Sequence, residues 1–221
     1  MNQDAQSEND FTVILANGEF PTSPYALSFF DEAKTLVCCD GAILHALERG
    51  RVPDYIVGDM DSTPPELQKR YADRIVRVAE QETNDLTKAF RFCREKGLAA
   101  RVVVLGATGK REDHTLGNLS RLVDFAAEAD DVRFVTDFGY FQAALSPGEF
   151  DALPGRQISI FSFSPNQAIA SCGLKYPLNQ LKLPRWHVAT LNEAIGDHFS
   201  LDFDPTLSPL LLFFANEIKG D

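Results

Sequence analysis

Residues 101–118 read RVVVLGATGKREDHTLGN, and this stretch decides the fold class. It opens with a β-branched apolar run that is typical of a strand buried on both faces of a sheet. Gly106 and Gly109 then form a loop whose backbone can approach a ligand closely. A helical pattern follows, and Asp113 can cap it. Strand, glycine loop and helix in this order predict one repeat of an α/β domain with parallel strands.

The same alternation extends outward over most of the chain, up to about residue 145. Strand-like apolar runs lie at residues 11–17, 35–41, 55–59, 74–78, 101–107 and 132–137. Helical patterns lie between or after them, at 23–34, 42–50, 64–72, 84–97 and 113–129. We therefore predict an α/β catalytic domain over residues 11–147, with a mainly parallel, Rossmann-like sheet covered by helices. Ligands of such sheets bind outside the carboxyl ends of the strands.

The pattern changes after SPGEF at residues 146–150. Short segments rich in Phe and punctuated by Pro, Gly and Asn lie at 156–164, 167–173, 187–203 and 210–218. They predict a smaller antiparallel β-sandwich over residues 148–221.

Composition excludes several classes of protein. The chain has 221 residues, 44% of them apolar, and a formal net charge of −11 with a pI near 4.8, which excludes a broad basic surface for nucleic acid. The polar first ten residues do not resemble a signal peptide, and we expect them to fray. The apolar run at 210–215 is too short to span a membrane. Four cysteines without CxxC pairing indicate reduced thiols in a cytoplasmic protein.

Two aspartates follow the strand at 55–59, in the stretch VPDYIVGDMDST at residues 52–63. If Asp59, Met60 and Asp61 are extended, both carboxylates lie on one side. Such carboxylates repel each other unless a cation neutralises them, and Mg²⁺ suits oxygen ligands. The alternative is a turn whose aspartates cap a helix that starts at Pro64 or Pro65. The position at a strand end favours a metal site.

A third carboxylate lies in QETNDLTKAF at residues 81–90. Thr83 or Asn84 can cap a helix here, which places Asp85 and Lys88 at i and i+3 on one face of its first turn. These two side chains could hold metal and phosphate together at a helix N-terminus. The alternative, which this stretch alone favours, is an ordinary surface ion pair.

The loop and helix at 106–118 supply positive charge through Lys110 and Arg111, and His114 and Asn118 lie at i and i+4 on one helix face. The stretch is not a P-loop, because GxxxxGK[ST] is absent, and no GxGxxG fingerprint occurs. A capped helix after a glycine turn explains Gly109, but it does not explain the clustered cations.

Three further residues have two interpretations each. Asp40 follows the strand at 35–41 and could contact a nucleotide, although capping the next helix is the favoured interpretation. Tyr176 and Trp186 could present an aromatic face to a flat cationic ring, although core packing is the more common role of an aromatic residue.

Taken in order, five groups of motifs resemble the thiamine pyrophosphokinase (thiamine diphosphokinase) family. They are CDGA (39–42), PDYIVGDMDS (53–62), QETNDLTKA (81–89), GATGKREDHTLGN (106–118), and GLKYPL (173–178) with TLNEA (190–194). The resemblance runs from about Asn17 to Glu193. It implies an α/β catalytic domain followed by a β-sandwich, in a homodimer with its active site between subunits. It also implies transfer of a pyrophosphoryl group from ATP to the thiamine hydroxyl, with Mg²⁺, giving thiamine diphosphate and AMP.

The resemblance also assigns roles to individual residues. The Mg²⁺ ligands would be Asp59, Asp61 and Asp85, which form the catalytic set with Lys88 and Arg111. The ATP-binding residues would be Asp40, Gly106, Gly109, Lys110, Arg111, Asp113, His114 and Asn118. The thiamine-binding residues would be Gln81, Leu174, Tyr176 and Asn192. Leu191 stands where the family tends to have Ser, a departure that concerns thiamine rather than ATP.

Two other functions stay open at this point. One is a diphosphokinase for another alcohol, such as a hydroxymethyl pterin, although GLKYPL favours thiamine. The other is a non-catalytic nucleotide- or thiamine-binding module, in which the three aspartates would be incidental. For the homodimer, the apolar segment LSPLLLFFA at 207–215 is a candidate contributor to the interface.

Overall fold

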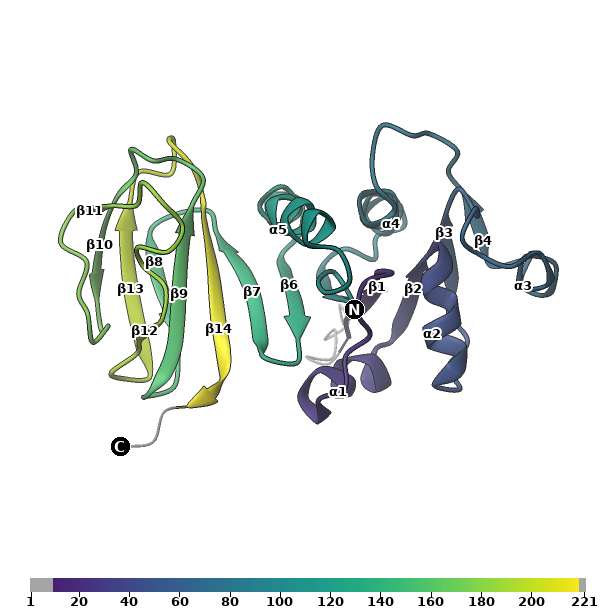
Figure 1. The fold of residues 1–221 in the computed structure, drawn as a ribbon, viewed down its shortest axis with the longest axis horizontal. Coiled ribbons are helices and arrows are strands. Elements are labelled where there is room, and N and C mark those ends of the chain that lie inside the picture. Colours follow the sequence, from purple (N-terminus) through teal and green to yellow (C-terminus); the bar gives the residue numbers. More distant parts are fainter. Residues whose placement is uncertain (1–9, 219–221) are drawn as a thin grey trace, which may run out of the picture. The chain divides into compact units, whose positions relative to one another are not determined.

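The computed structural model describes residues 10–218 and divides into two compact units (Figure 1). Unit 1 comprises residues 10–121 and 128–136, and unit 2 comprises residues 122–127 and 137–218. The polar start of the chain, apart from Asp10, lies outside the described residues. The domain division was predicted after residue 147. The units divide after Thr136 because residues 139–144, which show no alternating pattern, form a strand of unit 2.

Unit 1 contains a six-stranded sheet in which every neighbouring pair is parallel. In spatial order its strands are β6 (Asp131–Thr136), β5 (Arg101–Leu105), β1 (Thr12–Leu15), β2 (Thr35–Cys39), β3 (Tyr55–Gly58) and β4 (Ile75–Arg77). All six were predicted from their apolar runs. The mainly parallel α/β domain is therefore confirmed.

Helices follow the strands of this sheet. They are α1 (Pro24–Glu32), the 3₁₀ turn η1 (Asp40–Ala42), α2 (Ile43–Glu48), α3 (Pro65–Arg70), α4 (Asp85–Glu95) and α5 (Glu112–Ala126). Helix α4 packs on β1, β2 and β3, whereas α1 packs on β5. Cys38 and Cys39 are neighbours on β2 and both are buried, so both faces of the sheet are covered there. No helix in the described part of the chain has the length and apolar content that a bilayer crossing needs.

The order of the strands identifies where a ligand would bind. From β1 the chain builds β2, β3 and β4 on one side, and it then places β5 and β6 on the other side. The order in which the chain adds strands to the sheet therefore reverses between β1 and β5. In open α/β sheets such a reversal marks the ligand crevice outside the carboxyl ends of the strands.

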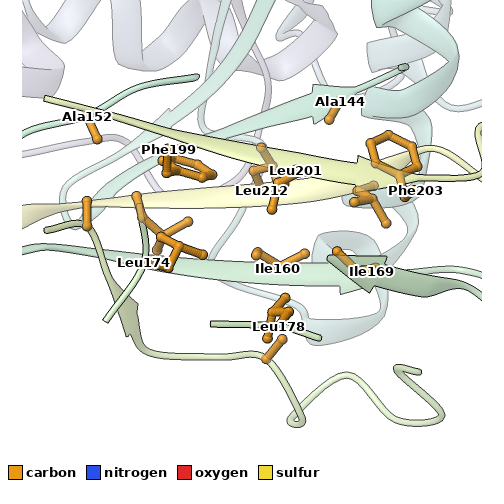
Figure 2. Packing of buried hydrophobic residues seen from close by; sticks show 14 of the residues in the cluster. Ala144, Ala152, Ile160, Ile169, Leu174, Leu178, Phe199, Leu201, Phe203 and Leu212 are labelled. Atoms are coloured by element: carbon orange, nitrogen blue, oxygen red, sulfur yellow. The ribbon is translucent and has the colours of Figure 1, made fainter. Parts of the chain in front are cut away.

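Unit 2 is an antiparallel β-sandwich, as predicted. One sheet has the order β12 (Asn192–Glu193), β9 (Arg156–Ser162), β14 (Leu210–Ile218) and β7 (Gly139–Ala144). The other has the order β11 (Leu181–Lys182), β10 (Ala168–Cys172), β13 (His198–Phe203) and β8 (Gly148–Asp151). Figure 2 shows the apolar core of this unit, with Ile160, Ile169, Phe199, Leu201 and Leu212 packed together.

The apolar segment proposed for a dimer interface belongs to this sandwich. Strand β14 pairs with β7 on one side and with β9 on the other. Leu210, Leu211, Leu212 and Phe214 of this strand are each at most 1% exposed. Their apolar surface is already buried within the chain and does not form a free patch, so the homodimer prediction gains nothing from them.

Candidate functional site

A cavity of about 320 Å³ lies in unit 1 at the reversal of strand order between β1 and β5. Its walls come from the segments that follow the strands: residues 16–18 after β1, Cys39 at the end of β2, and Ser62 beyond β3. The first turn of α4 (84–86), the loop after β5 (107 and 109–111), and His114 and Asn118 of α5 complete it. The sequence analysis did not single out Asn17, Cys39 or Ser62 as site residues. Each lies at or shortly after the end of a strand, which was the available signal.

Two loops of this cavity are joined backbone to backbone. Gly18 N donates to the Gly106 carbonyl at 2.8 Å, and Glu19 N donates to the Thr108 carbonyl at 2.9 Å. A Cβ atom on Gly18 would lie 2.2 Å from the Gly106 oxygen, and one on Gly109 would lie 2.4 Å from Glu19 Cβ. Gly106 and Gly109 were expected to let the backbone approach a ligand. The close approach that requires glycine here is between the two loops.

The aspartates after β3 converge through a turn. Met60 has φ of +70°, so the expected extended Asp59-Met60-Asp61 is wrong, and Asp61 N donates to Asp59 Oδ1 at 3.2 Å. The helix-cap alternative is also wrong, because α3 is preceded by Pro64 without a side-chain cap. Among the described residues, one group of carboxylates could hold a metal ion, with oxygens of Asp40, Asp59 and Asp61 within 4.8 Å of one another.

Asp40 is the buried member of this group, with 1% of its surface exposed. The favoured prediction, that it caps a helix, is wrong: Asp40 Oδ2 accepts from Ser62 N at 3.0 Å and Oδ1 accepts from Thr63 Oγ1 at 2.6 Å. Burial raises the pKa of Asp40, and these two hydrogen bonds oppose that rise. Neighbouring Asp61 and Asp85 raise the pKa further. A cation would remove this unfavourable crowding of negative charge.

Asp59 has a partner that was predicted for another role. Gln81 Nε2 donates to Asp59 Oδ2 at 2.8 Å. This hydrogen bond, followed by the Asp61 backbone bond and the charge of Lys88, lowers the pKa of Asp59. Gln81, expected at thiamine, therefore lies against the turn of Asp59, Met60 and Asp61, which we call the acidic turn.

Asp85 and Lys88 form the predicted i, i+3 pair on α4, at 3.1 Å. Lys88 is only 4% exposed, so the alternative of an ordinary surface pair is wrong. Burial alone would lower the pKa of Lys88, but the hydrogen bond and charge of Asp85, with the charges of Asp59 and Glu80, raise it overall. The structure thus places a buried ammonium group beside the acidic turn. Asp85 lies outside the Asp40, Asp59 and Asp61 group.

The predicted cap of α4 also joins two helices. Asn84 Oδ1 accepts from Thr87 N at 3.0 Å, as a helix N-cap does. Asn84 Nδ2 donates to Asn118 Oδ1 at 2.9 Å, and Asn118 Nδ2 donates to the Ala107 carbonyl at 2.8 Å. Asn118 lines the cavity with His114, which confirms that these two residues share a face of α5.

The cations of the loop after β5 are exposed. Lys110 Nζ donates to the Asn17 carbonyl at 3.0 Å and lies 3.4 Å from His45 Nε2. Arg111 Nε lies 3.0 Å from Asp113 Oδ1, within an exposed ion pair. Helix α5 begins one residue before Asp113, so the predicted cap is instead the second helical residue. The Arg111 bond holds the pKa of Asp113 down to about 2.

The remaining thiamine candidates lie in unit 2. Tyr176 is 62% exposed. Asn192 is buried and hydrogen-bonds to both backbone polar groups of Tyr176. Its Oδ1 accepts from Tyr176 N at 3.1 Å, and its Nδ2 donates to Tyr176 O at 2.7 Å. Leu174 is buried in the sandwich core, and Leu191 is 65% exposed. Trp186 donates to the Ser162 carbonyl at 3.1 Å and packs edge-on against Phe161 and Phe163.

The fold and the site define the class: an α/β unit with a strand-end cavity lined by Asp85, Lys110 and Arg111 and with a carboxylate cluster that contacts Ser62 in its wall, followed by a β-sandwich. Two family models match this chain, "Thiamin pyrophosphokinase, catalytic domain" over residues 26–135 and "Thiamin pyrophosphokinase, substrate-binding domain" over residues 139–207. Thiamin pyrophosphokinase 1 of Caenorhabditis elegans is 31% identical over 186 residues, covering 77% of this chain and 75% of that protein. The chain belongs to the thiamine pyrophosphokinase family.

Other relatives agree with this assignment. The thiamine pyrophosphokinase of Bacillus subtilis is 29% identical over 174 residues, covering 75% of this chain and 80% of that protein. The crystal structure of thiamin pyrophosphokinase from Geobacillus thermodenitrificans superposes with a TM-score of 0.74 at 24% identity, over 94% of this chain and 98% of that one. At this level of sequence identity the superposition is evidence for the fold alone.

Proposed function

We propose that this chain transfers a pyrophosphoryl group from ATP to the hydroxyl of thiamine, giving thiamine diphosphate and AMP. One observation carries the proposal. Asp85, Lys110 and Arg111 line the cavity at the β1–β5 reversal, and Asp40 and Asp61 of the acidic cluster contact Ser62 in its wall. Transfer of phosphoryl groups depends mainly on positioning and charge neutralisation. The match of both domain models to this chain supports the same conclusion.

The proposed chemistry makes one bond and breaks one. The thiamine hydroxyl oxygen bonds to the β-phosphorus of ATP, and the bond from that phosphorus to the oxygen bridging it to the α-phosphate breaks. AMP leaves with the bonding pair, and the hydroxyl proton passes to a base. This step differs from that of a simple kinase, in which attack at the γ-phosphorus releases ADP.

The carboxylates fit Mg²⁺, which is a hard cation that prefers oxygen ligands and shares them with substrate phosphates. Asp59 and Asp61 would hold the ion, as predicted. Asp40 joins them because its oxygens lie in the same 4.8 Å group, and Asp85 would approach from α4. When bound, Mg²⁺ neutralises charge on the phosphates of ATP.

The cations and polar groups around the cavity would hold the nucleotide. Lys88 and Arg111 would clamp the phosphates, with Lys110 beside them. Lys88 is fixed by burial and by Asp85, whereas Arg111 must exchange Asp113 for phosphate. His114 and Asn118 line the cavity and would contact the rest of the nucleotide.

Tyr176 is the exposed aromatic residue we propose for thiamine, with Asn192 fixing its backbone and Leu174 supporting the segment from the core. A tyrosine ring attracts a flat cationic heterocycle through its π face. Tyr176→Leu should weaken thiamine binding by about 1 kcal/mol while ATP binding stays unchanged. Tyr25→Leu, at another exposed tyrosine, is the matched control for isothermal titration. Equal thiamine affinities in both variants would remove Tyr176 from the site.

We also propose a homodimer with its active site between subunits, in the cytoplasm. The family resemblance supports the dimer, and four free cysteines support a reducing compartment. Light scattering at working concentration measures the first directly. A monomeric mass with full activity would contradict it.

The reaction is tested by separating AMP from ADP after incubation with thiamine, ATP and Mg²⁺. We expect one AMP for each thiamine diphosphate. Stoichiometric ADP without AMP would refute pyrophosphoryl transfer. AMP release that needs a pterin alcohol instead of thiamine would keep the chemistry and change the acceptor.

A further inference from the structure

The backbone of the acidic turn is held by two side chains outside the cavity. Arg77, the last residue of β4, donates from Nη1 to the Asp59 carbonyl at 2.7 Å and from Nη2 to Gln68 Oε1 at 2.9 Å. Gln68 of α3 donates from Nε2 to the Met60 carbonyl and the Thr63 carbonyl, both at 2.8 Å. We call Gln68 and Arg77 the bracket.

The bracket holds the turn through hydrogen bonds to backbone carbonyls. It reaches the carbonyls of Asp59, Met60 and Thr63, and neither Gln68 nor Arg77 lines the cavity of the candidate site. Both line a separate groove of about 430 Å³, which shares no residue with that cavity. Of residues 59–63, Ser62 lines that cavity, and the two side chains hold the carbonyls of other residues in this segment.

The turn needs such support. Met60 has φ of +70°, a conformation that L-residues with side chains rarely adopt. Such a conformation persists only when its surroundings determine it from several directions. The bracket fixes the peptide carbonyl before Met60 and the one after it. It thereby fixes the direction in which Asp59 and Asp61 leave the backbone.

We propose that Gln68 and Arg77 are positioning residues that hold Asp59 and Asp61 in the geometry a divalent cation requires. The inference rests on the proposed function, which places Mg²⁺ at these carboxylates. Mg²⁺ demands near-ideal octahedral geometry, and partners that orient its ligands control affinity although they never touch the ion. The bracket does this through the main chain.

For a variant that removes the charge of Arg77, electrostatics alone predicts tighter cation binding, whereas the proposal predicts weaker cation binding. Arg77 is a positive charge near the carboxylates, so its removal should strengthen cation binding if the charge were all that mattered. If Arg77 positions the turn, its removal weakens cation binding. Gln68 carries no charge, so Gln68→Met isolates positioning. Arg77→Lys keeps the charge but loses the planar fork that reaches the Asp59 carbonyl and Gln68 together.

The experiment measures Mn²⁺ binding to the purified chain by electron paramagnetic resonance of the free ion, with and without a non-hydrolysable ATP analogue. Wild type is compared with Gln68→Met, Arg77→Met and Arg77→Lys. The matched control is Arg74→Met, because Arg74 Nη1 also donates to a backbone carbonyl, that of Pro53 before β3, at 2.6 Å. Thermal unfolding and circular dichroism check that each variant folds.

We expect the three bracket variants to bind Mn²⁺ about tenfold or more weakly, the range measured for residues that orient metal ligands. Arg74→Met should bind Mn²⁺ like wild type. Unchanged or tighter binding in Arg77→Met, wild-type binding in Gln68→Met, or no Mn²⁺ binding by wild type in either condition would each overturn the proposal. Mn²⁺ binding needs no turnover, so a failed AMP assay with the expected Mn²⁺ series would refute the reaction and leave the bracket standing.

Discussion

Two strand-end loops lie beside the cavity, and they are held in place in different ways. The turn after β3 carries Asp59 and Asp61, and side chains hold it: Gln68, Arg77 and the carboxylate of Asp40. The loop after β5 carries Lys110 and Arg111. Backbone amides of the loop after β1 hold it, at places where no Cβ fits.

This difference determines how each loop can be altered. A loop held by side chains can be loosened by truncating one of them, and its geometry can be tuned. A loop held mainly by backbone contacts at glycines depends less on neighbouring side chains, and it is disrupted by adding a single methyl group. The acidic turn should therefore respond in function, and the glycine loop in stability.

The largest effect is expected at the acidic turn itself. Asp59→Asn removes charge from the proposed cation site while its shape stays the same. The rate of AMP release should therefore fall by at least about a hundredfold, which is the upper end of the range for residues that orient metal ligands without touching the ion. Steady-state kinetics measures the loss, and thermal unfolding should show a folded protein. Asp73→Asn, an exposed aspartate before β4, is the control. Near-normal Mg²⁺-dependent activity in Asp59→Asn would contradict the assignment of Asp59 to the cation site.

The glycine loop should show a smaller effect, on stability. Gly18→Ala brings Cβ to 2.2 Å from the Gly106 oxygen and 2.5 Å from the Thr108 oxygen, so the loops must separate. We expect the free energy of unfolding to fall by about 1–3 kcal/mol, as overpacking does.

The control for Gly18 is another glycine. Gly117→Ala lies in α5 with nothing within 4 Å, so it should raise the free energy of unfolding by up to about 1 kcal/mol through helix propensity. Urea unfolding measures both variants. Equal effects of the two alanines would show that the contact between the loops does not matter.

The effect of Asp40→Asn on the free energy of unfolding should depend on pH. Burial raises the pKa of Asp40, so the folded chain keeps a proton that the unfolded chain releases near pH 3.9. The contribution of Asp40 to stability therefore falls as pH rises through that window. We therefore expect the free energy of unfolding of Asp40→Asn, relative to that of wild type, to rise as the pH is raised from below 4 to 7 without Mg²⁺.

Urea unfolding at several pH values follows this rise, and added Mg²⁺ should reduce it because the ion neutralises the wild-type carboxylates. A loss of stability at pH 7 would mean that the bonds from Ser62 and Thr63 outweigh the buried charge.

The smallest effect is expected for the exposed pair beside the glycine loop. Arg111 holds the pKa of Asp113 down to about 2, so its contribution to stability is present above the ordinary aspartate pKa and is lost only as pH falls through about 2. Between pH 5 and 8 the thermal midpoint of Asp113→Asn should match that of wild type, because exposed pairs contribute little. A clear shift in this range would show that the pair stabilises the start of α5.

Sequence patterns predicted what depends on local periodicity. Each predicted strand of unit 1 was found, as were the Asn84 cap and the shared face of His114 and Asn118. These features depend on residues within a few positions of one another. Strand β7 was missed because its small and aromatic residues do not alternate.

The failures share a physical cause, which is contact between residues far apart in sequence. Asp40 was assigned to a local cap, but its partners, Ser62 and Thr63, lie more than twenty positions away. Lys88 looked like a surface cation until tertiary packing buried it. Met60 adopts a left-handed conformation for which its own sequence gives no signal, supported by Gln68 and Arg77.

The distribution of the cysteines has a practical consequence for labelling. Cys38, Cys39 and Cys93 are buried, and burial raises the pKa of each thiol, that of Cys93 to about 12. Thiolate is the reactive form, so these three should resist alkylating dyes in the folded chain. Cys172, at the end of β10, is exposed. A fluorophore can therefore be attached to the sandwich at a single position without mutagenesis, leaving every residue of the candidate-site cavity unmodified.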